Sequence, residues 1–270
     1  MVRLIATDLD GTLVPPGRPV PEPVLAALKE ALDRQIQVVP ASGRSLAAFP
    51  EEILGLSGLR YVISSNGAMI QDIRERRLLR QVLIEASDAA EILRMLYQEG
   101  LYSCVYSGNK IYNWRWLPSY LERYYASRMS IFRQNPQEDL AAFVEQCGSG
   151  VEKLFIAVHD PRQRERIRQN LGKWPDVRIT SSSSWNLEVN RQGADKGSAL
   201  AWLAGWLRIP QEETAALGDN ENDRTMLAFA GRSAAPENGT KEAKMLAREL
   251  FPPCEDGGAA VFLKKILLDR

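Results

Sequence analysis

The chain has 270 residues, more than one hydrophobic core usually needs, so its length favours two domains or one large domain. Apolar residues make up 45% of it and 34 basic side chains balance 34 acidic ones, which argues against disorder, nucleic-acid partners and membrane surfaces. The three cysteines are widely separated, and no apolar run approaches the length of a membrane span, about 20 residues. These features predict a cytoplasmic protein with reduced thiols.

The first part of the chain alternates strand and helix patterns. Residues 2–7 form a short apolar run that predicts a buried strand, and a proline-rich loop over 14–23 leads into an amphipathic helix. Further strands are predicted over 36–40 and 61–64. This alternation predicts an α/β fold with a Rossmann-like parallel-sheet core and right-handed crossovers.

The pattern changes after about residue 84. Residues 103–116 and 178–189 are typical of β-ribbons, because aromatic and β-branched residues alternate there with Ser, Gly and Asn. Between the two ribbons and beside them the sequence predicts a strand at 153–158. It also predicts three helices, at 87–98, 137–147 and 161–172. The α/β alternation returns with a helix that begins at Lys196 and a strand over 214–217.

Chemically active residues follow four of the predicted strands: Asp8-Leu9-Asp10-Gly11-Thr12, Ser42-Gly43-Arg44, Asn66-Gly67 and Gly218-Asp219-Asn220-Glu221-Asn222-Asp223. In an open parallel sheet, ligands bind outside the carboxyl ends of the strands. Each motif alone is also typical of a turn or a helix cap. Together they gather carboxylates without imidazole or thiolate, a donor set that suits Mg²⁺.

These motifs resemble those of the haloacid-dehalogenase-like hydrolase superfamily, and specifically its Cof-type sugar-phosphatase branch. The first motif is matched by residues 8–13, the second by 42–44, the third by Lys196-Gly197 and the fourth by 218–223. The late stretch 255–258 is also similar, although the branch usually has valine where this chain has glycine.

The resemblance implies roles for the acidic residues. Asp8 would be the nucleophile that attacks phosphorus and forms an aspartyl-phosphate. Asp10 would protonate the leaving alcohol and then activate the hydrolytic water, and an extended strand would point it to the same side as Asp8. Mg²⁺ would be held by the Asp8 carboxylate, the Asp10 carbonyl and Asp219, with Asp223 supporting these ligands.

The resemblance also implies which groups bind the phosphoryl oxygens. They are the N–H groups of Leu9 and Gly43 and the side chains of Ser42, Lys196 and Asn222. Arg44 and Trp185 are further candidates for substrate contact; Arg44 could instead cap a helix, but the resemblance favours the site. For Asn66, a turn role before Gly67 is favoured over a role in the site.

The spacing of the motifs locates an inserted domain. The interval between Asp8 and Ser42 has room for only a loop and one helix. The interval from Ser42 to Lys196 is far longer than one crossover needs. We therefore predict a catalytic core formed by residues 1–84 and 188–270. Residues 85–187 would form an α+β cap domain that selects the substrate.

The sequence thus predicts a magnesium-dependent phosphatase that hydrolyses small phosphate monoesters, by resemblance sugar phosphates, through a phospho-aspartate on Asp8. A phosphomutase of the same superfamily is one alternative, since a related branch returns the phosphoryl group to another hydroxyl instead of to water, although the match to the hydrolytic branch is closer. A non-catalytic sugar-phosphate-binding module is another, although every catalytic position is filled. The expected partner is a small phosphorylated metabolite, with no nucleic acid and no membrane, and the expected assembly is a monomer or a weak homo-oligomer.

Overall fold

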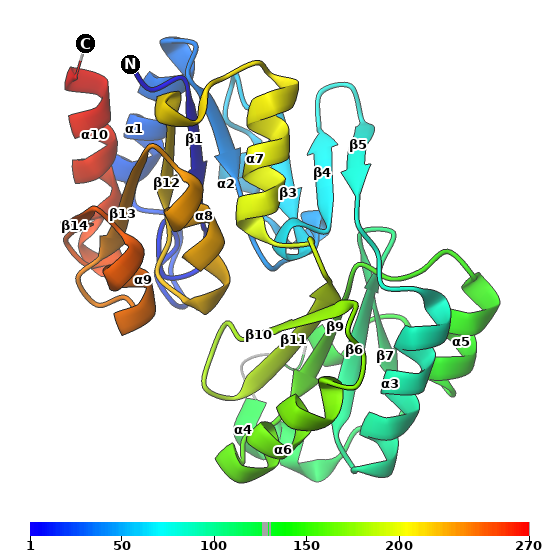
Figure 1. Cartoon of the computed structure of the whole chain (residues 1–270). Coiled ribbons are helices and arrows are strands. Elements are labelled where there is room, and N and C mark those ends of the chain that lie inside the picture. The colour runs from blue at the N-terminus through cyan, green and yellow to red at the C-terminus, as the bar shows by residue number, and fades with distance from the viewer. Residues whose placement is uncertain (126–128, 130, 270) are drawn as a thin grey trace. The chain divides into compact units, whose positions relative to one another are not determined.

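The computed structural model describes residues 1–125, 129 and 131–269. It divides into two compact units, one formed by Met1–Arg80 with Asp195–Arg270 and the other by Gln81–Ala194 (Figure 1). Each unit has its own sheet and its own hydrophobic cluster, so each is described by itself.

The first unit contains a five-stranded parallel sheet in the order β14-β13-β12-β1-β2. In that order the strands are Glu249–Phe251, Arg232–Pro236, Thr214–Leu217, Leu4–Thr7 and Gln37–Pro40. The register pairs Thr7 of β1 with Leu217 on one side and with Pro40 on the other. The residues that follow these three strands therefore meet at one edge of the sheet, and the predicted α/β fold with a parallel core is confirmed.

Helices cover both faces of this sheet (Figure 1). Apolar side chains of α1 (Glu22–Asp33) and α10 (Ala259–Leu268) share a cluster with Ile5 of β1. Those of α7 (Lys196–Trp206) and α8 (Arg224–Phe229) share another cluster with the neighbouring Leu4 and Ala6. Successive strand residues point to opposite faces, so a strand buried on both sides reads as one continuous apolar run.

A small sheet in the order β3-β4-β5 extends the first unit beside β2. Its strands are Tyr61–Ser64, Met69–Asp72 and Arg77–Gln81, and a parallel bridge between Ala41 and Ile63 connects it to the end of β2. Two short helices complete the unit, α2 (Glu51–Leu54) and α9 (Lys241–Leu246).

The second unit is built on a six-stranded sheet in the order β10-β11-β9-β6-β7-β8. In that order the strands are Val177–Thr180, Asn186–Arg191, Lys153–Ala157, Tyr102–Ser107, Lys110–Trp114 and Pro136–Gln137. Its helices are α3 (Ala86–Gln98), α4 (Ser119–Tyr125), α5 (Leu140–Cys147) and α6 (Pro161–Leu171). None of these six strands joins the sheet that carries Asp8, and the unit has α+β composition.

The joins between the units lie near, but not at, the predicted residues. The second unit extends to Ala194, past the predicted end at 187, because β11 pairs along its length with the antiparallel strands β9 and β10. It begins at Gln81 instead of 85. The role of this unit as a substrate-selecting cap stays a prediction.

Two simpler expectations can be compared with the described residues. All three cysteines are free thiols, with Cys104 and Cys254 buried and Cys147 exposed. Among the helices of the described residues, none combines the length and the apolar content that crossing a bilayer requires.

The glycine at 258, where the related branch usually has valine, has a steric explanation. A Cβ on Gly258 would lie 1.8 Å from the carbonyl oxygen of Pro252. The N–H of Gly258 donates to the carbonyl of Pro253 at 3.2 Å, which holds the turn before α10 against this backbone. A larger residue at 258 therefore requires the Pro252 backbone to move.

We predict that Gly258→Ala lowers the free energy of unfolding by about 1–3 kcal/mol, because the methyl group overpacks against main chain. Gly205→Ala is the matched control, since Gly205 lies inside α7 with no neighbouring atom near the added methyl group. That change should stabilise the protein by about 0.5–1 kcal/mol. Urea unfolding of both variants measures the difference, and equal stabilities would contradict the tight packing at Gly258.

Candidate active site

Asp8 lies directly after β1, where the chain turns back on itself. Its N–H donates to the carbonyl of Leu217 on β12 at 2.9 Å, and its side chain is almost fully buried. The carbonyl of Leu9 then accepts three N–H groups, from Thr12 at 3.3 Å, Leu13 at 2.9 Å and Val14 at 2.7 Å. This tight turn fixes Asp8 at the carboxyl edge of the sheet.

Gly11 lets this turn approach the end of β12. Its φ is +85°, and a Cβ would lie 2.6 Å from Oδ2 of Asp219. The hydroxyl of Thr12 donates to Oδ1 of Asp219 at 3.2 Å. The turn after β1 therefore orients a carboxylate that belongs to a distant part of the sequence.

Asp223 organises the loop after β12. Its Oδ2 accepts the N–H groups of Asp219 at 2.9 Å and Asn220 at 3.0 Å, and its side chain is completely buried. Gly218 makes this possible, because a Cβ there would lie 2.5 Å from the Cβ of Asp223. The loop is thus fixed by backbone contacts to a single carboxylate.

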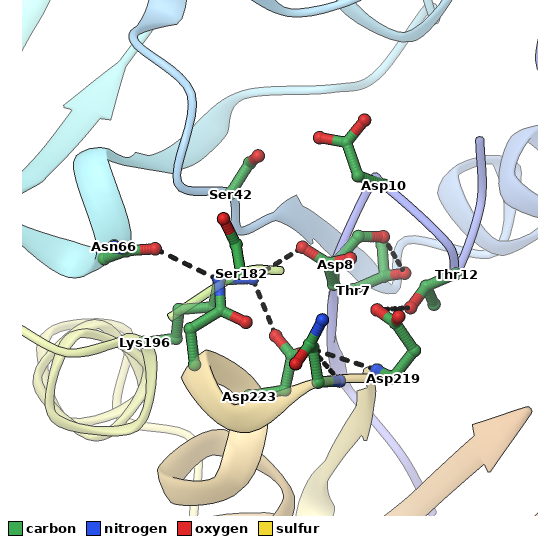
Figure 2. Close-up of polar contacts among 12 residues, drawn as sticks. Thr7, Asp8, Asp10, Thr12, Ser42, Asn66, Ser182, Lys196, Asp219 and Asp223 are labelled. Carbon is green, nitrogen blue, oxygen red and sulfur yellow. Dashed lines mark hydrogen bonds and ion pairs between the residues drawn. The ribbon is translucent and has the colours of Figure 1, made fainter. Parts of the chain in front are cut away.

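Lys196, at the start of α7, connects the two loops (Figure 2). Its Nζ donates to Oδ1 of Asp8 at 2.5 Å and to Oδ1 of Asp223 at 2.6 Å, with no exposed side-chain surface. Burial opposes the charge, but the attraction of Asp223 and Asp8 outweighs it and raises the pKa of Lys196. The ammonium therefore stays charged between two carboxylates.

Three carboxylates meet at this point, those of Asp8, Asp219 and Asp223, and each offers an oxygen within 4.8 Å of the others. Burial, together with the neighbouring carboxylates, raises the pKa of Asp8 well above its usual range and that of Asp219 to about 7, although Lys196 acts in the opposite direction. One ammonium leaves this partly buried cluster with excess negative charge. Its all-oxygen donor set is one that can hold a divalent cation.

Asp10 takes a different position from the one expected. Its carboxylate accepts two hydrogen bonds from Arg44, from Nε at 2.8 Å and from Nη2 at 2.5 Å, and Figure 2 shows it pointing away from Asp8. Arg44 also donates to the carbonyl of Ala48 at 2.8 Å. The expected same-side orientation does not occur because β1 ends at Thr7, so Asp10 lies in the turn and not on an extended strand.

Residues after β2 and β3 complete the edge of the sheet. Ser42 is buried, and its N–H donates to the carbonyl of Ile63 at 2.9 Å. Asn66 has the positive φ of 58° that a turn residue adopts, as predicted, and its Oδ1 also accepts from the Asn222 amide at 3.2 Å. Asn66 is therefore the turn residue that was favoured, and its contact with Asn222 leaves a role in the site as a prediction.

Sequence reasoning missed two residues that position the others. Thr12 holds Asp219, and Asp195 begins α7 by accepting from the N–H of Ser198 at 2.9 Å and from its hydroxyl at 2.8 Å. An aspartate directly before a predicted helix is a typical N-cap, so Asp195 could have been identified.

Trp185 lies in the second unit, in the turn between β10 and β11. It is partly buried there and packs edge-on against Phe155, with ring centroids 5.8 Å apart. The residues of the acidic cluster therefore all belong to the first unit, and Trp185 packs against the hydrophobic core of the other unit.

The sequence of this chain is similar to those of known phosphatases. The profile of the haloacid dehalogenase-like hydrolase family matches residues 5–263. Phosphatase YwpJ of Bacillus subtilis (strain 168) is 33% identical over 295 residues, which cover 98% of this chain and all of the relative. An HMP-PP phosphatase of Klebsiella pneumoniae (strain 342) is 30% identical over 245 residues, which cover 90% of this chain and 87% of the relative.

A solved structure of a haloacid dehalogenase-like hydrolase from B. subtilis is also similar. It superposes with a TM-score of 0.79 at 29% identity, over 97% of this chain and 99% of that one. The match extends through both units, and the residues of the acidic cluster lie within the matched range. The chain therefore belongs to the haloacid dehalogenase-like hydrolase family and is a phosphatase, a phosphoric monoester hydrolase.

Proposed function

We propose that this phosphatase uses Mg²⁺ and a phospho-aspartate on Asp8 to hydrolyse small phosphate monoesters, with sugar phosphates as its main substrate class. The observation that carries the proposal is the buried contact of Lys196 with Asp8 at 2.5 Å, beside the carboxylates of Asp219 and Asp223. An ammonium that binds one carboxylate oxygen orients the carboxylate, which is what a positioned nucleophile requires.

The proposed reaction has two steps. First, an Asp8 oxygen attacks phosphorus, the bond from phosphorus to the ester oxygen breaks, and Asp10 gives its proton to the departing alcohol. Then a water gives a proton to Asp10 and attacks the phosphorus of the aspartyl-phosphate. This second step releases phosphate and restores the Asp8 carboxylate.

Asp10 has to turn toward Asp8 for both steps. In its ion pair with Arg44, the Asp10 side chain is 58% exposed and that of Arg44 is 33% exposed, so the pair is worth only on the order of 1 kcal/mol. Substrate binding can therefore displace it. In this proposal Arg44 is a positioning residue that holds Asp10 between turnovers. Direct contact of Arg44 with the substrate would require the same ion pair to open.

Hydrogen-bond donors and positive charge support the proposed phosphoryl site. In the described part of the chain, no acceptor binds the N–H of Leu9, which lies between Asp8 and Asp10. Ser42 is buried at the same edge, with its hydroxyl accepting from the N–H of Arg44 at 3.2 Å. We propose that the phosphoryl oxygens accept hydrogen bonds from Leu9 and Ser42. Gly43, Lys196 and Asn222 would provide the other donors.

The acidic cluster fits Mg²⁺. Both oxygens of Asp223 are already occupied, one by Lys196 and the other by two backbone N–H groups, so Asp223 would act through the groups it holds. Asp8 and Asp219 are then the carboxylate ligands, together with the Asp10 carbonyl. When bound, the ion supplies positive charge against the phosphoryl oxygens.

The choice of substrate within the class is assigned to the second unit. The core residues named above contact only the phosphoryl group, which every phosphate monoester shares, so discrimination needs other residues. Trp185 and the serine-rich turn before it are the candidates from that unit. The proposal of sugar phosphates itself rests on the resemblance to the Cof-type branch.

Asp8→Asn should lower the rate of p-nitrophenyl phosphate hydrolysis by at least about a thousandfold, because the amide keeps the shape and removes the nucleophile. Asp33→Asn, which changes an exposed aspartate at the end of α1, is the matched control and should leave the rate unchanged. Circular dichroism checks that both variants fold. If Asp8→Asn kept more than a few per cent of the activity, the covalent mechanism would be wrong.

EDTA should abolish the activity and Mg²⁺ should restore it, whereas Ca²⁺ should inhibit, because calcium takes more ligands at longer distances and would disturb the position of Asp8. Asp219→Ala should raise the Mg²⁺ concentration needed for half-maximal rate or eliminate turnover. Steady-state rates across a metal titration give both results. Full activity in EDTA would exclude the proposed ion.

Asp219→Asn should flatten the dependence of stability on pH in the metal-free protein. Burial raises the pKa of Asp219 from 3.8 to about 7, so the folded protein holds this proton more tightly than the unfolded chain. The free energy of unfolding should therefore fall as pH rises from about 4 to about 7 and then level off. Urea unfolding in EDTA measures this for both proteins, and parallel curves would contradict the assignment.

A further inference from the structure

A hollow lies in the first unit, away from the acidic cluster. Its volume is about 420 Å³, and three arginines line it, Arg3, Arg60 and Arg74, together with Gln35 and Gln37. None of its lining residues, all of them in the described part of the chain, is acidic. In a chain with no net charge, this is a local concentration of positive charge.

The hollow is at the amino ends of the strands. Arg3 directly precedes β1, Gln37 begins β2 and Arg60 directly precedes β3. The catalytic residues follow the carboxyl ends of the same strands. Arg3 and Asp8 are therefore separated by the length of β1, roughly 16 Å, and the hollow is distinct from the active site.

The positive charge of the hollow is only partly neutralised. Arg3 pairs with Glu213 at 2.8 Å, and Nε of Arg60 pairs with Asp72 at 2.9 Å. Arg74 donates through Nε to the carbonyl of Leu59 at 3.1 Å, and no carboxylate in the described part of the chain pairs with it. The remaining oxygen of Asp72 accepts backbone N–H groups, so it does not compensate Arg74.

Two guanidinium groups that line the hollow have donors available for an oxyanion. Arg60 and Arg74 are each anchored through Nε, and Arg60 also lies over the ring of Tyr61, 5.2 Å from its centroid. Within the described residues, the Nη groups of both have no protein acceptor. A guanidinium held in this way offers a rigid pair of donors, which binds phosphate in a bidentate manner.

The remaining walls indicate that the ligand has an organic part. Leu207 and Ile209, after α7, line the hollow together with Tyr61, and its volume falls in the range of small-molecule sites rather than single ions. We propose that this hollow binds a small organic phosphate, with Arg60 and Arg74 holding the phosphate group and the apolar wall contacting its organic part.

The test is an NMR titration of the ¹⁵N-labelled full-length protein with phenylphosphonate, whose carbon–phosphorus bond resists hydrolysis, and with inorganic phosphate. The amide signals of Gly58 and Tyr61 report on the hollow, and those of Leu9 and Gly43 report on the active site. We expect saturable shifts at Gly58 and Tyr61, with phenylphosphonate binding there more tightly than phosphate. No saturable shift at these two amides would overturn the proposal, and equal or tighter binding of phosphate would overturn its organic part.

Arg74→Glu should weaken binding at Gly58 and Tyr61 by at least about tenfold and leave the response of Leu9 and Gly43 unchanged. Arg77→Glu is the matched control, because Arg77 is an exposed residue at the start of β5 and does not line the hollow. It should leave binding at the hollow unchanged.

Arg3→Gln provides a second variant, in case the Arg74 variant folds poorly, and it should also weaken binding at the hollow. The dispersion of the amide spectrum verifies folding of each protein. Equal effects of Arg74→Glu and Arg77→Glu would show that the response follows total charge, and would overturn the site.

Discussion

The first unit depends on one buried charge, the ammonium of Lys196 between Asp8 and Asp223. Removing a lysine from water costs several kcal/mol unless it gains close partners, and here two carboxylates from different loops provide them. Each of those carboxylates would be destabilised by burial without the ammonium. These two ion pairs therefore hold together the start of α7 and the loops that follow β1 and β12, and the negative charge that remains gives a cluster that can hold a metal ion.

The glycines of the site show how closely these loops approach. Gly11 faces the carboxylate of Asp219, Gly67 faces the backbone of Asp195, and Gly218 faces Asp223. At each position a single methyl group would collide with an atom that the site needs. The small residues of the motifs are thus required for contact between loops as much as for the conformation of the turns themselves.

Much of this arrangement could be predicted from the sequence. The predicted strands at 61–64 and 214–217 agree with the structure residue for residue, because each is a short apolar run that a polar motif ends. β13 and β5 were missed, since one is rich in alanine and ends in proline and the other is exposed, and neither has a β-strand pattern. The ion pair of Asp10 with Arg44 was also missed, because it joins two loops whose paths the sequence does not specify.

The position of β1 in the sheet has a consequence for the order of folding. β1 pairs with β2, which follows it closely in the chain, and with β12, which is synthesised only after the whole of the second unit. During synthesis one edge of β1 therefore stays unpaired while Gln81–Ala194, a contiguous segment, can already fold. Such a long-range pairing also slows folding, because a large loop must close first. The charged centre of the enzyme can therefore be completed only after the second unit has been synthesised, when the strand before Gly218 pairs with β1.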